Sequence, residues 1–149
     1  MKELSVAAIS EGTVIDHIPS QQTFKVVEIL NLSTTADLVS VATNLESKRM
    51  HKKGIVKIGG RELSKREVDK IALVAPRATL NIIKNYKVYR KIMLTIPGEV
   101  EKIVKCFNPN CITNHEKVTT KFVVTSKQPL SLKCHYCERI MAGSEMVLL

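Results

Sequence analysis

Four cysteines near the C-terminus are the residues of this sequence whose types and spacing most clearly suit chemistry. Cys106, Cys111, Cys134 and Cys137 follow the pattern C-x4-C-x22-C-x2-C. Two close pairs set far apart are typical of two short turns that close on one tetrahedral Zn²⁺. Four thiolates fill the coordination shell, whereas a catalytic zinc keeps one position open for water. The pattern therefore predicts one structural zinc ion per chain.

Two disulfides, or four unrelated thiols, are the alternatives to a metal site. A reducing compartment argues against disulfides, and unrelated cysteines rarely show this spacing. His115 and His135 lie near the cysteines in the sequence and could replace a ligand, but we expect both to be ordinary surface residues.

The rest of the chain lacks the motifs of common catalytic sites. It contains no P-loop, no G-x-G-x-x-G, no H-E-x-x-H and no nucleophile elbow. Asp16-His17 is a candidate acid–base pair, but neighbouring residues of a strand point to opposite faces. Taken alone, this dipeptide fits a polar strand edge, and Lys52, Lys53 and Lys57 fit a solvated strand face.

Charge and composition limit the class of partner. The chain is 44% hydrophobic and 25% charged, which is typical of a globular protein. Its net charge of +9 favours an anionic partner, whether nucleic acid, nucleotide phosphates or an acidic protein surface. Residues 1–97 hold 16 Lys/Arg against 9 Asp/Glu, and residues 98–149 hold 7 against 5. The attraction for anions therefore lies mainly in the first two-thirds of the chain.

No segment suits a membrane or an export signal. No apolar run approaches the ~20 residues of a membrane-spanning helix, and the N-terminus lacks the long apolar stretch of a secretory signal. We therefore expect a cytoplasmic protein with reduced cysteines and no membrane partner.

The elements that must position these residues alternate between strands and helices. One helix is expected to open at Pro19-Ser20 with Ser20 as its N-cap. A second starts with the capping box Ser64-Lys65-Arg66-Glu67 and stops at Pro76. Patterns typical of strands cover residues 4–9, 13–18, 37–45, 54–58, 79–83 and 88–96.

This order predicts an α+β fold in two domains. Residues 1–97 are expected to form a ferredoxin-like α/β sandwich with an antiparallel sheet and two helices. Pro97-Gly98 is the natural boundary. Residues 98–149 are too few for an apolar core alone to stabilise, and we expect a small β-rich, rubredoxin-like domain held by zinc.

Several stretches, taken in order, resemble the regulatory chain of aspartate carbamoyltransferase. Gly12-Thr13-Val14-Ile15-Asp16-His17-Ile18-Pro19 is similar to the N-terminal signature of that family. The same holds for residues 75–81 and 85–88 in the middle of the chain, and for residues 106–114 and 132–138 around the cysteines. The ordered set is far more specific than any single stretch.

The resemblance implies a regulatory chain without an active site of its own. Such chains pair as dimers through the N-terminal domain, while the zinc domain docks on the catalytic chains and links catalytic trimers. The implied effectors are nucleoside triphosphates, with CTP and often UTP as inhibitors and ATP as activator.

The resemblance also implies an effector pocket, residue by residue. Val6, Ala8 and Ile9 match a strand whose backbone reads the base, although Ala7 stands where some members have an acidic residue. Asp16 matches a carboxylate near the ribose, and His17 a residue near the phosphates. A cationic group of the family is matched by Lys53, Lys57 and Lys91. The rest of the pocket wall is matched by Asn81, Ile83, Tyr86 and Val88.

Two other classes of function fit parts of the sequence. A zinc-ribbon nucleic-acid binder fits the net charge and the cysteines, but the cysteine segment is nearly neutral and aromatic residues for base stacking are scarce. A metalloenzyme also fits the cysteines. The predicted zinc shell argues against it, because that shell is closed. We therefore expect no nucleic-acid partner and no catalysis by this chain.

Overall fold

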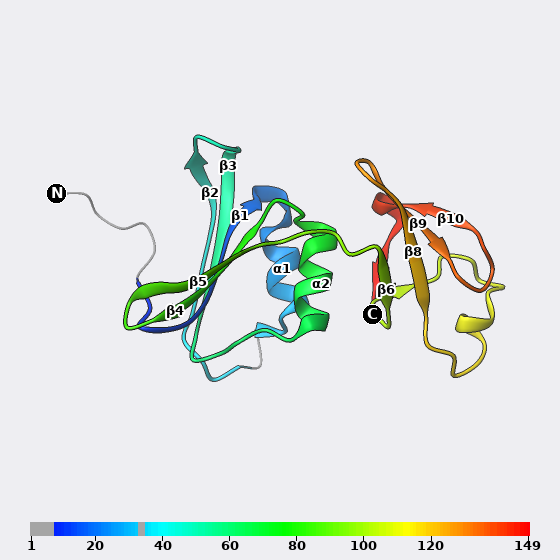
Figure 1. Cartoon of the computed structure of the whole chain (residues 1–149), viewed down its shortest axis with the longest axis horizontal. Helices are drawn as coiled ribbons and strands as arrows, with labels where there is room; N and C mark the ends of the chain where they lie inside the picture. Colours follow the sequence, from blue (N-terminus) through cyan, green and yellow to red (C-terminus); the bar gives the residue numbers. More distant parts are fainter. Residues whose placement is uncertain (1–7, 33–34) are drawn as a thin grey trace. The chain divides into compact units, whose positions relative to one another are not determined.

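The computed structural model describes residues 8–32 and 35–149 (Figure 1). The chain divides into two compact units, the first ending at Thr95 and the second running from Ile96 to Leu149. None of the helices among the described residues is long and apolar enough to span a membrane.

A five-stranded antiparallel sheet forms the first unit, in the strand order β2-β3-β1-β4-β5. Two helices lie against one of its faces (Figure 1). The βαββαβ sequence with the order β2-β3-β1-β4 confirms the predicted ferredoxin-like fold, and β5 extends the sheet beyond β4. The strands are β1 (Glu11–Pro19), β2 (Val39–Ser47), β3 (His51–Gly59), β4 (Thr79–Lys84) and β5 (Lys87–Met93), and the helices are α1 (Thr23–Ile29) and α2 (Lys65–Val74).

The core of this unit lies between the sheet and the helices. Ile15 on β1 pairs with Val56 on β3 and with Leu80 on β4, so all three side chains share one face of the sheet. They pack against Val26 of α1 and Ile71 of α2. Burying each such side chain stabilises the fold by about 1.5–3 kcal/mol. No helix of the described residues lies on the opposite face of the sheet, which is called the helix-free face.

Local signals place α2 as predicted. Ser64 Oγ accepts a hydrogen bond from the Glu67 N–H at 3.2 Å, and Glu67 Oε1 accepts one from the Ser64 N–H at 3.1 Å, which is the expected capping box. The helix ends at Val74, before Pro76. At the turn Gly59-Gly60, β3 ends and Gly60 has φ +67°, so the expected turn is also confirmed.

The start of the first helix differs from the prediction. Ser20 does not cap α1, because the chain first makes a 3-10 turn (η1, Ser20–Gln22) and α1 begins only at Thr23. The Ser20 hydroxyl is buried without a hydrogen-bond partner among the described residues. The predicted strand 4–9 lies outside the described residues over 4–7, and Ala8 and Ile9 precede β1 without joining it.

Short strands build the second unit. A four-stranded antiparallel sheet has the order β10-β9-β8-β6, and β11 pairs with β7 in a separate two-stranded sheet. Phe122, Leu132, Met141, Val100 and Val104 are almost fully buried, so the unit has a small apolar core. Its elements are β6 (Glu99–Glu101), β7 (Val104–Lys105), η3 (Ile112–Asn114), β8 (Lys121–Lys127), β9 (Leu130–Cys134), β10 (Ile140–Ala142), η4 (Gly143–Glu145) and β11 (Val147–Leu148).

Candidate metal centre and candidate effector face

The four cysteine sulfurs of the second unit converge on one point. All four Sγ atoms lie within 4.8 Å of one another. The Sγ atoms of Cys106 and Cys137 are 3.6 Å apart, and those of Cys111 and Cys134 are 3.7 Å apart. A tetrahedral ion with metal–sulfur bonds of about 2.3 Å would hold its sulfurs about 3.8 Å apart. The cluster therefore has the dimensions of a tetrahedral thiolate site.

Two turns supply the cysteines in pairs. Cys106 directly follows β7 and Cys111 precedes η3, whereas Cys134 ends β9 and Cys137 lies before β10. In the first turn, the Cys111 N–H donates to the Asn108 carbonyl at 3.0 Å. In the second, the Glu138 N–H donates to the Cys134 carbonyl at 3.0 Å, with Glu138 at φ +62°.

Backbone N–H groups surround the sulfurs in a regular pattern. Each sulfur accepts a hydrogen bond from the N–H of the residue two positions later, namely Asn108, Thr113, Tyr136 and Arg139. The Thr113 hydroxyl also donates to Cys111 Sγ at 3.1 Å. Such donors offset the negative charge that four thiolates would place around a divalent ion.

Burial and these donors act on the thiols in opposite directions. Burial raises the pKa of Cys106 to about 12. Burial also acts to raise the pKa of Cys137, but the Arg139 N–H and the Asn108 side chain outweigh it and bring the value to about 7. The pKa of Cys111 is lowered, because hydrogen bonds from Thr113 outweigh burial. The turns therefore favour the thiolate form at part of the cluster before any cation is considered.

Neither nearby histidine belongs to the cluster. His115 Nε2 lies 2.7 Å from the Pro109 carbonyl on the surface. The His135 ring packs edge-on against Tyr136, with 5.1 Å between the ring centroids. The donor set is thus four sulfurs, which suits a soft or borderline cation and leaves no position for water.

On the helix-free face of the first unit, strand register aligns several of the predicted effector residues. Val14 pairs with Lys57 of β3 on one side and with Asn81 of β4 on the other, and Asn81 pairs in turn with Lys91 of β5. Paired residues of an antiparallel sheet point to the same face. Because Val14 alternates with the core residue Ile15, this row lies on the helix-free face.

A β-bulge brings Asp16 and His17 together. The pairing of β1 with β3 shifts between Ile15 and Ile18, and His17 adopts φ +58°. Its Nδ1 lies 3.1 Å from Thr79 Oγ1, and Thr79 is the residue that pairs with Asp16. The expectation that the two neighbours point to opposite faces is therefore wrong, because the bulge interrupts the alternation.

Asp16 also organises the cations around it. Its Oδ1 accepts from Lys53 Nζ at 2.8 Å and from the His17 N–H at 2.6 Å. Burial acts to raise the pKa of Asp16, but these two partners outweigh it and the pKa is lowered. Burial lowers the pKa of His17, with Lys53, Arg49 and Lys91 acting in the same direction and Asp16 against it.

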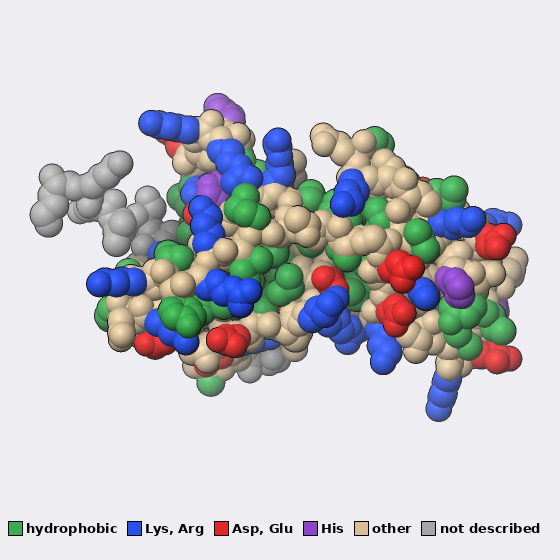
Figure 2. All heavy atoms as spheres, in the orientation of Figure 1, with side chains coloured by type: hydrophobic (Ala, Val, Ile, Leu, Met, Phe, Trp, Pro, Cys, Tyr) green, Lys and Arg blue, Asp and Glu red, His purple; other side chains and the backbone are tan. Residues whose placement is uncertain are grey.

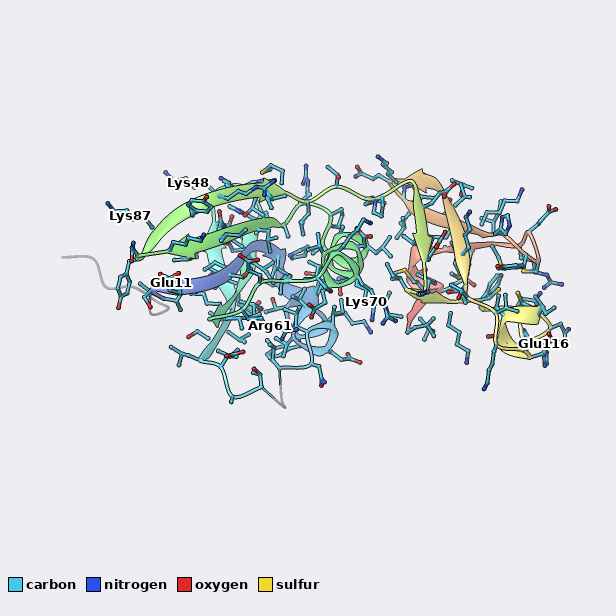
Figure 3. All side chains as sticks on the ribbon, turned by 60° about the horizontal axis from the view of Figure 1, so that its bottom comes forward. Glu11, Lys48, Arg61, Lys70, Lys87 and Glu116 are labelled. Carbon is cyan, nitrogen blue, oxygen red and sulfur yellow. The ribbon has the colours of Figure 1, made fainter. Side chains whose placement is uncertain are left out.

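The other end of the helix-free face is apolar. Ile9, Val14 and Ile83 form a buried cluster with Ile55 packed against it. The β4–β5 turn closes this end: the Tyr86 N–H donates to the Ser10 carbonyl at 3.1 Å, and the Asn85 N–H to Glu11 Oε1 at 3.2 Å. Figure 3 places Glu11 and Lys87 at this same end of the sheet. The turn therefore lies beside the segment that contains Ala8 and Ile9.

The predicted effector residues differ in how far they are exposed to solvent. Tyr86 and Val88 are exposed by 70% and 58% of their surface, so they form a rim. Val6 lies outside the described residues.

Figure 2 shows Lys and Arg side chains gathered, with His among them, over the end of the β2–β3 hairpin.

Sequence reasoning missed Arg49, Thr79 and Thr113. Thr79 and Arg49 approach His17 only through strand pairing and a hairpin turn, and no local motif marks them. Thr113 follows Cys111 by two residues, a spacing that could have suggested a hydrogen bond to the sulfur.

Comparisons with known proteins agree with both units. The family model described as the aspartate carbamoyltransferase regulatory chain, allosteric domain, matches residues 4–95. The model of the metal binding domain of the same regulatory chain matches residues 98–147.

Curated relatives match along almost the whole chain. The aspartate carbamoyltransferase regulatory chain of Pyrococcus abyssi is 56% identical over 149 residues, covering 99% of this chain and 98% of the relative. That of Pyrococcus horikoshii is 57% identical with the same coverage. That of Methanocaldococcus jannaschii is 49% identical over 141 residues, covering 95% and 94%.

The chain joins a ferredoxin-like domain to a four-cysteine domain, and the family models describe these as the allosteric domain and the metal binding domain of a regulatory chain. The chain belongs to the family of aspartate carbamoyltransferase regulatory chains. It therefore has an allosteric domain and a metal-binding domain, and it serves a catalytic partner.

Proposed function

We propose that the helix-free face binds nucleoside triphosphates and that their binding alters the activity of the catalytic chains. The observation that carries this proposal is the polarity of the face. One end is apolar, around Ile83 and Val14, and the other is cationic, around His17 and Lys53. A nucleotide has the same polarity, with a flat base at one end and phosphates at the other.

The dimensions of the face suit this orientation. Thr79 and Ile83 lie on one face of β4 four residues apart, which is about 13 Å along the strand. We place the base over Val14 and Ile83, against the backbone of Ala8 and Ile9, with Tyr86 and Val88 at the rim. Backbone amides and carbonyls there can distinguish the amino and keto edges of a base. The family resemblance adds Val6 to the residues that read the base.

The polar residues then meet the ribose and the phosphates. Lys53 and the His17 N–H both bind Asp16 Oδ1, and we propose that Oδ2 accepts a ribose hydroxyl. Lys57 and Lys91, which lie in one row through Val14 and Asn81, meet the phosphates with Lys53 and His17. Hydrogen bonds with charged groups contribute about 1.5–3 kcal/mol each, so a few of them suffice for specific binding.

We propose that the metal is Zn²⁺, one per chain, in a structural role. The sulfur separations and the donor set of Cys106, Cys111, Cys134 and Cys137 support this choice. When bound, the ion supplies a crosslink between the two turns. The chain's own contribution is the ring of N–H donors that holds the sulfurs in place.

The proposed assembly is the one that the family resemblance implies. We propose that residues 1–97 form the effector domain and pair two regulatory chains, and that residues 98–149 dock on the catalytic chain. The effectors are CTP, UTP and ATP, the end products and energy carrier relevant to pyrimidine biosynthesis. The complex works in the cytoplasm, where the thiols stay reduced, without a nucleic-acid or membrane partner.

A substrate saturation curve of the mixed complex tests this function. The catalytic chain alone should be active and insensitive to CTP and ATP, and adding the regulatory chain should make it sensitive. Coupling of about 1–3 kcal/mol predicts a several-fold shift in apparent substrate affinity. If the complex forms and its curves coincide at every nucleotide concentration, the chain is a scaffold and the proposal is wrong.

A further inference from the structure

Arg49, in the turn between β2 and β3, is exposed and makes a hydrogen bond to another part of the first unit. Its Nη2 donates a hydrogen bond to the Arg77 carbonyl at 3.2 Å. Arg77 belongs to the connection between α2 and β4. The contact therefore holds the guanidinium group against a different part of the first unit.

This position is close to the cationic end of the helix-free face. Arg77 precedes Thr79 by two residues, and Thr79 Oγ1 contacts His17 Nδ1 at 3.1 Å. The field of Arg49 also reaches the His17 ring: after burial, the cations Lys53, Arg49 and Lys91 lower the pKa of His17. The hydrogen bond to Arg77 and the effect on the His17 pKa thus place Arg49 at the same end of the helix-free face as His17.

Positive charge exceeds negative charge around this point. The charged groups that act on His17 are the Asp16 carboxylate and three cations, Lys53, Arg49 and Lys91. Asp16 is already engaged by Lys53 at 2.8 Å. The remaining two cations therefore favour an added anion at this end.

We propose that Arg49 binds the terminal phosphate of the effector and so makes the site prefer nucleoside triphosphates to monophosphates. This inference rests on the proposed function, because it extends the same site. A guanidinium group can donate two parallel hydrogen bonds to one phosphate, a geometry that a lysine ammonium cannot reproduce. Lys57 and Lys91 lie in the row of Val14 and Asn81, farther along the strands from the hairpin turn, and meet the phosphates closer to the ribose.

The neighbouring Lys48 provides a matched control. It lies in the same turn and carries the same charge, but it lines a separate cavity of about 600 Å³ at the tip of the hairpin, with Glu46, Ser47, His51 and Lys52. Removing its charge changes the long-range field of the hairpin without removing the guanidinium group that bonds to the Arg77 carbonyl.

The experiment is calorimetric titration of the full chain with CTP, CMP, ATP and AMP. We expect Arg49→Gln to weaken CTP and ATP binding at least about tenfold while CMP and AMP change less than about twofold. Lys48→Gln should leave triphosphate affinity within about threefold of the wild type, because salt screens the interaction of an exposed charge with the phosphates. Arg49→Lys should retain part of the preference, because it keeps the charge and loses the planar fork.

Several outcomes would overturn the inference. Equal weakening of triphosphates and monophosphates by Arg49→Gln would make the residue a general contact. If Lys48→Gln weakens triphosphate binding as much as Arg49→Gln does, Arg49 acts only through its long-range electrostatic field, or the phosphates lie in the hairpin cavity. Unchanged triphosphate affinity in both Arg49 variants would remove the residue from the site. If the wild type binds none of the four nucleotides, the proposed function itself fails.

Discussion

His17 illustrates how a strained residue can serve a binding site. Its φ of +58° falls in the left-handed region, which costs a non-glycine residue about 1–3 kcal/mol. The β-bulge that imposes this conformation turns the ring to Thr79, beside Asp16 and three cations. In the free protein this environment lowers the pKa of His17, and a bound phosphate would raise it.

Nucleotide binding should therefore be linked to proton uptake at His17. Because the bound form holds the proton more tightly than the free form, affinity for CTP should rise as pH falls through the His17 pKa of the bound form. It should level off below the pKa of free His17, which lies below the ordinary value of about 6.5. The charges facing the ring are Asp16, which favours its protonation, and Lys53, Arg49 and Lys91, which oppose it. Calorimetry in buffers of different ionisation enthalpy measures the proton uptake directly.

The control for this prediction is His17→Gln titrated over the same pH range. The terminal phosphate of the nucleotide also titrates near pH 6, and the variant retains that contribution alone. Proton uptake of equal size in the wild type and in His17→Gln would show that the nucleotide, not the histidine, takes up the proton.

Lys91 carries a second prediction at the scale of single residues. Lys91→Ala should weaken CTP and ATP binding by at least about tenfold, because it removes a charged partner of the phosphates. Lys87→Ala is the control: both residues are exposed on β5, but Lys87 pairs with Lys84 at the apolar end, and Lys91 pairs with Asn81. Calorimetry that finds unchanged affinity in Lys91→Ala would exclude this lysine from the site.

The residue scale also marks a limit of sequence reasoning. Alternation along a strand assigns Asp16 and His17 to opposite faces, and nothing in the local sequence announces the bulge that reverses this. The thiolate cluster was easier to predict, because cysteine is a rare residue and its spacing alone indicates a shared site.

Among the elements, β3 and α1 approach each other at one glycine. Thr23 at the start of α1 is fully buried, and its hydroxyl donates to the Ser20 carbonyl at 2.9 Å and lies 3.1 Å from Thr43 Oγ1. A Cβ added at Gly54 of β3 would overlap the Thr23 side chain. This close packing fixes the helix against the sheet.

Gly54→Ala should therefore destabilise the first unit by about 1–3 kcal/mol, as overpacking does in other cores. The natural control is Gly98→Ala, since a Cβ there meets no atom within 4 Å. Urea unfolding followed by far-UV circular dichroism compares the two variants. A Gly54→Ala midpoint equal to that of the wild type would mean that α1 can shift at no cost.

The elements differ in how well their sequences announce them. The capping box and Pro76 define α2 through local chemistry, and the prediction was correct to within a residue or two. The β2–β3 hairpin was underestimated: strands were expected over 37–45 and 54–58, whereas β2 runs to Ser47 and β3 starts at His51. Its tip is polar on both faces, so no hydrophobic alternation reveals it, and the position of Arg49 could not be predicted.

At the scale of the whole molecule, we propose that the two units divide regulation between them. The proposed effector residues lie in the unit that ends at Thr95, and the cysteine cluster lies in the unit that begins at Ile96. Allostery requires two distinct sites, each of which favours one state of the assembly. The second unit, which holds the cysteine cluster, must then stay folded. If it is the docking domain and unfolds, it cannot pass on the state that an effector favours in the first unit.

The metal should decide whether that second unit folds and docks at all. Its apolar core is small, and structural zinc contributes on the order of 10 kcal/mol in domains of this kind. We expect Cys137→Ser to lose bound zinc and to abolish assembly with the catalytic chain, while nucleotide binding by the first unit persists. His135→Ala, in the same turn but outside the sulfur cluster, should keep both metal and assembly. Metal analysis of the purified chains and sedimentation of the mixed subunits measure the two properties separately.

Assembly that survives in Cys137→Ser without bound metal would show that the apolar core alone builds the docking surface. Loss of zinc in His135→Ala would instead place the histidine among the groups that hold the ion.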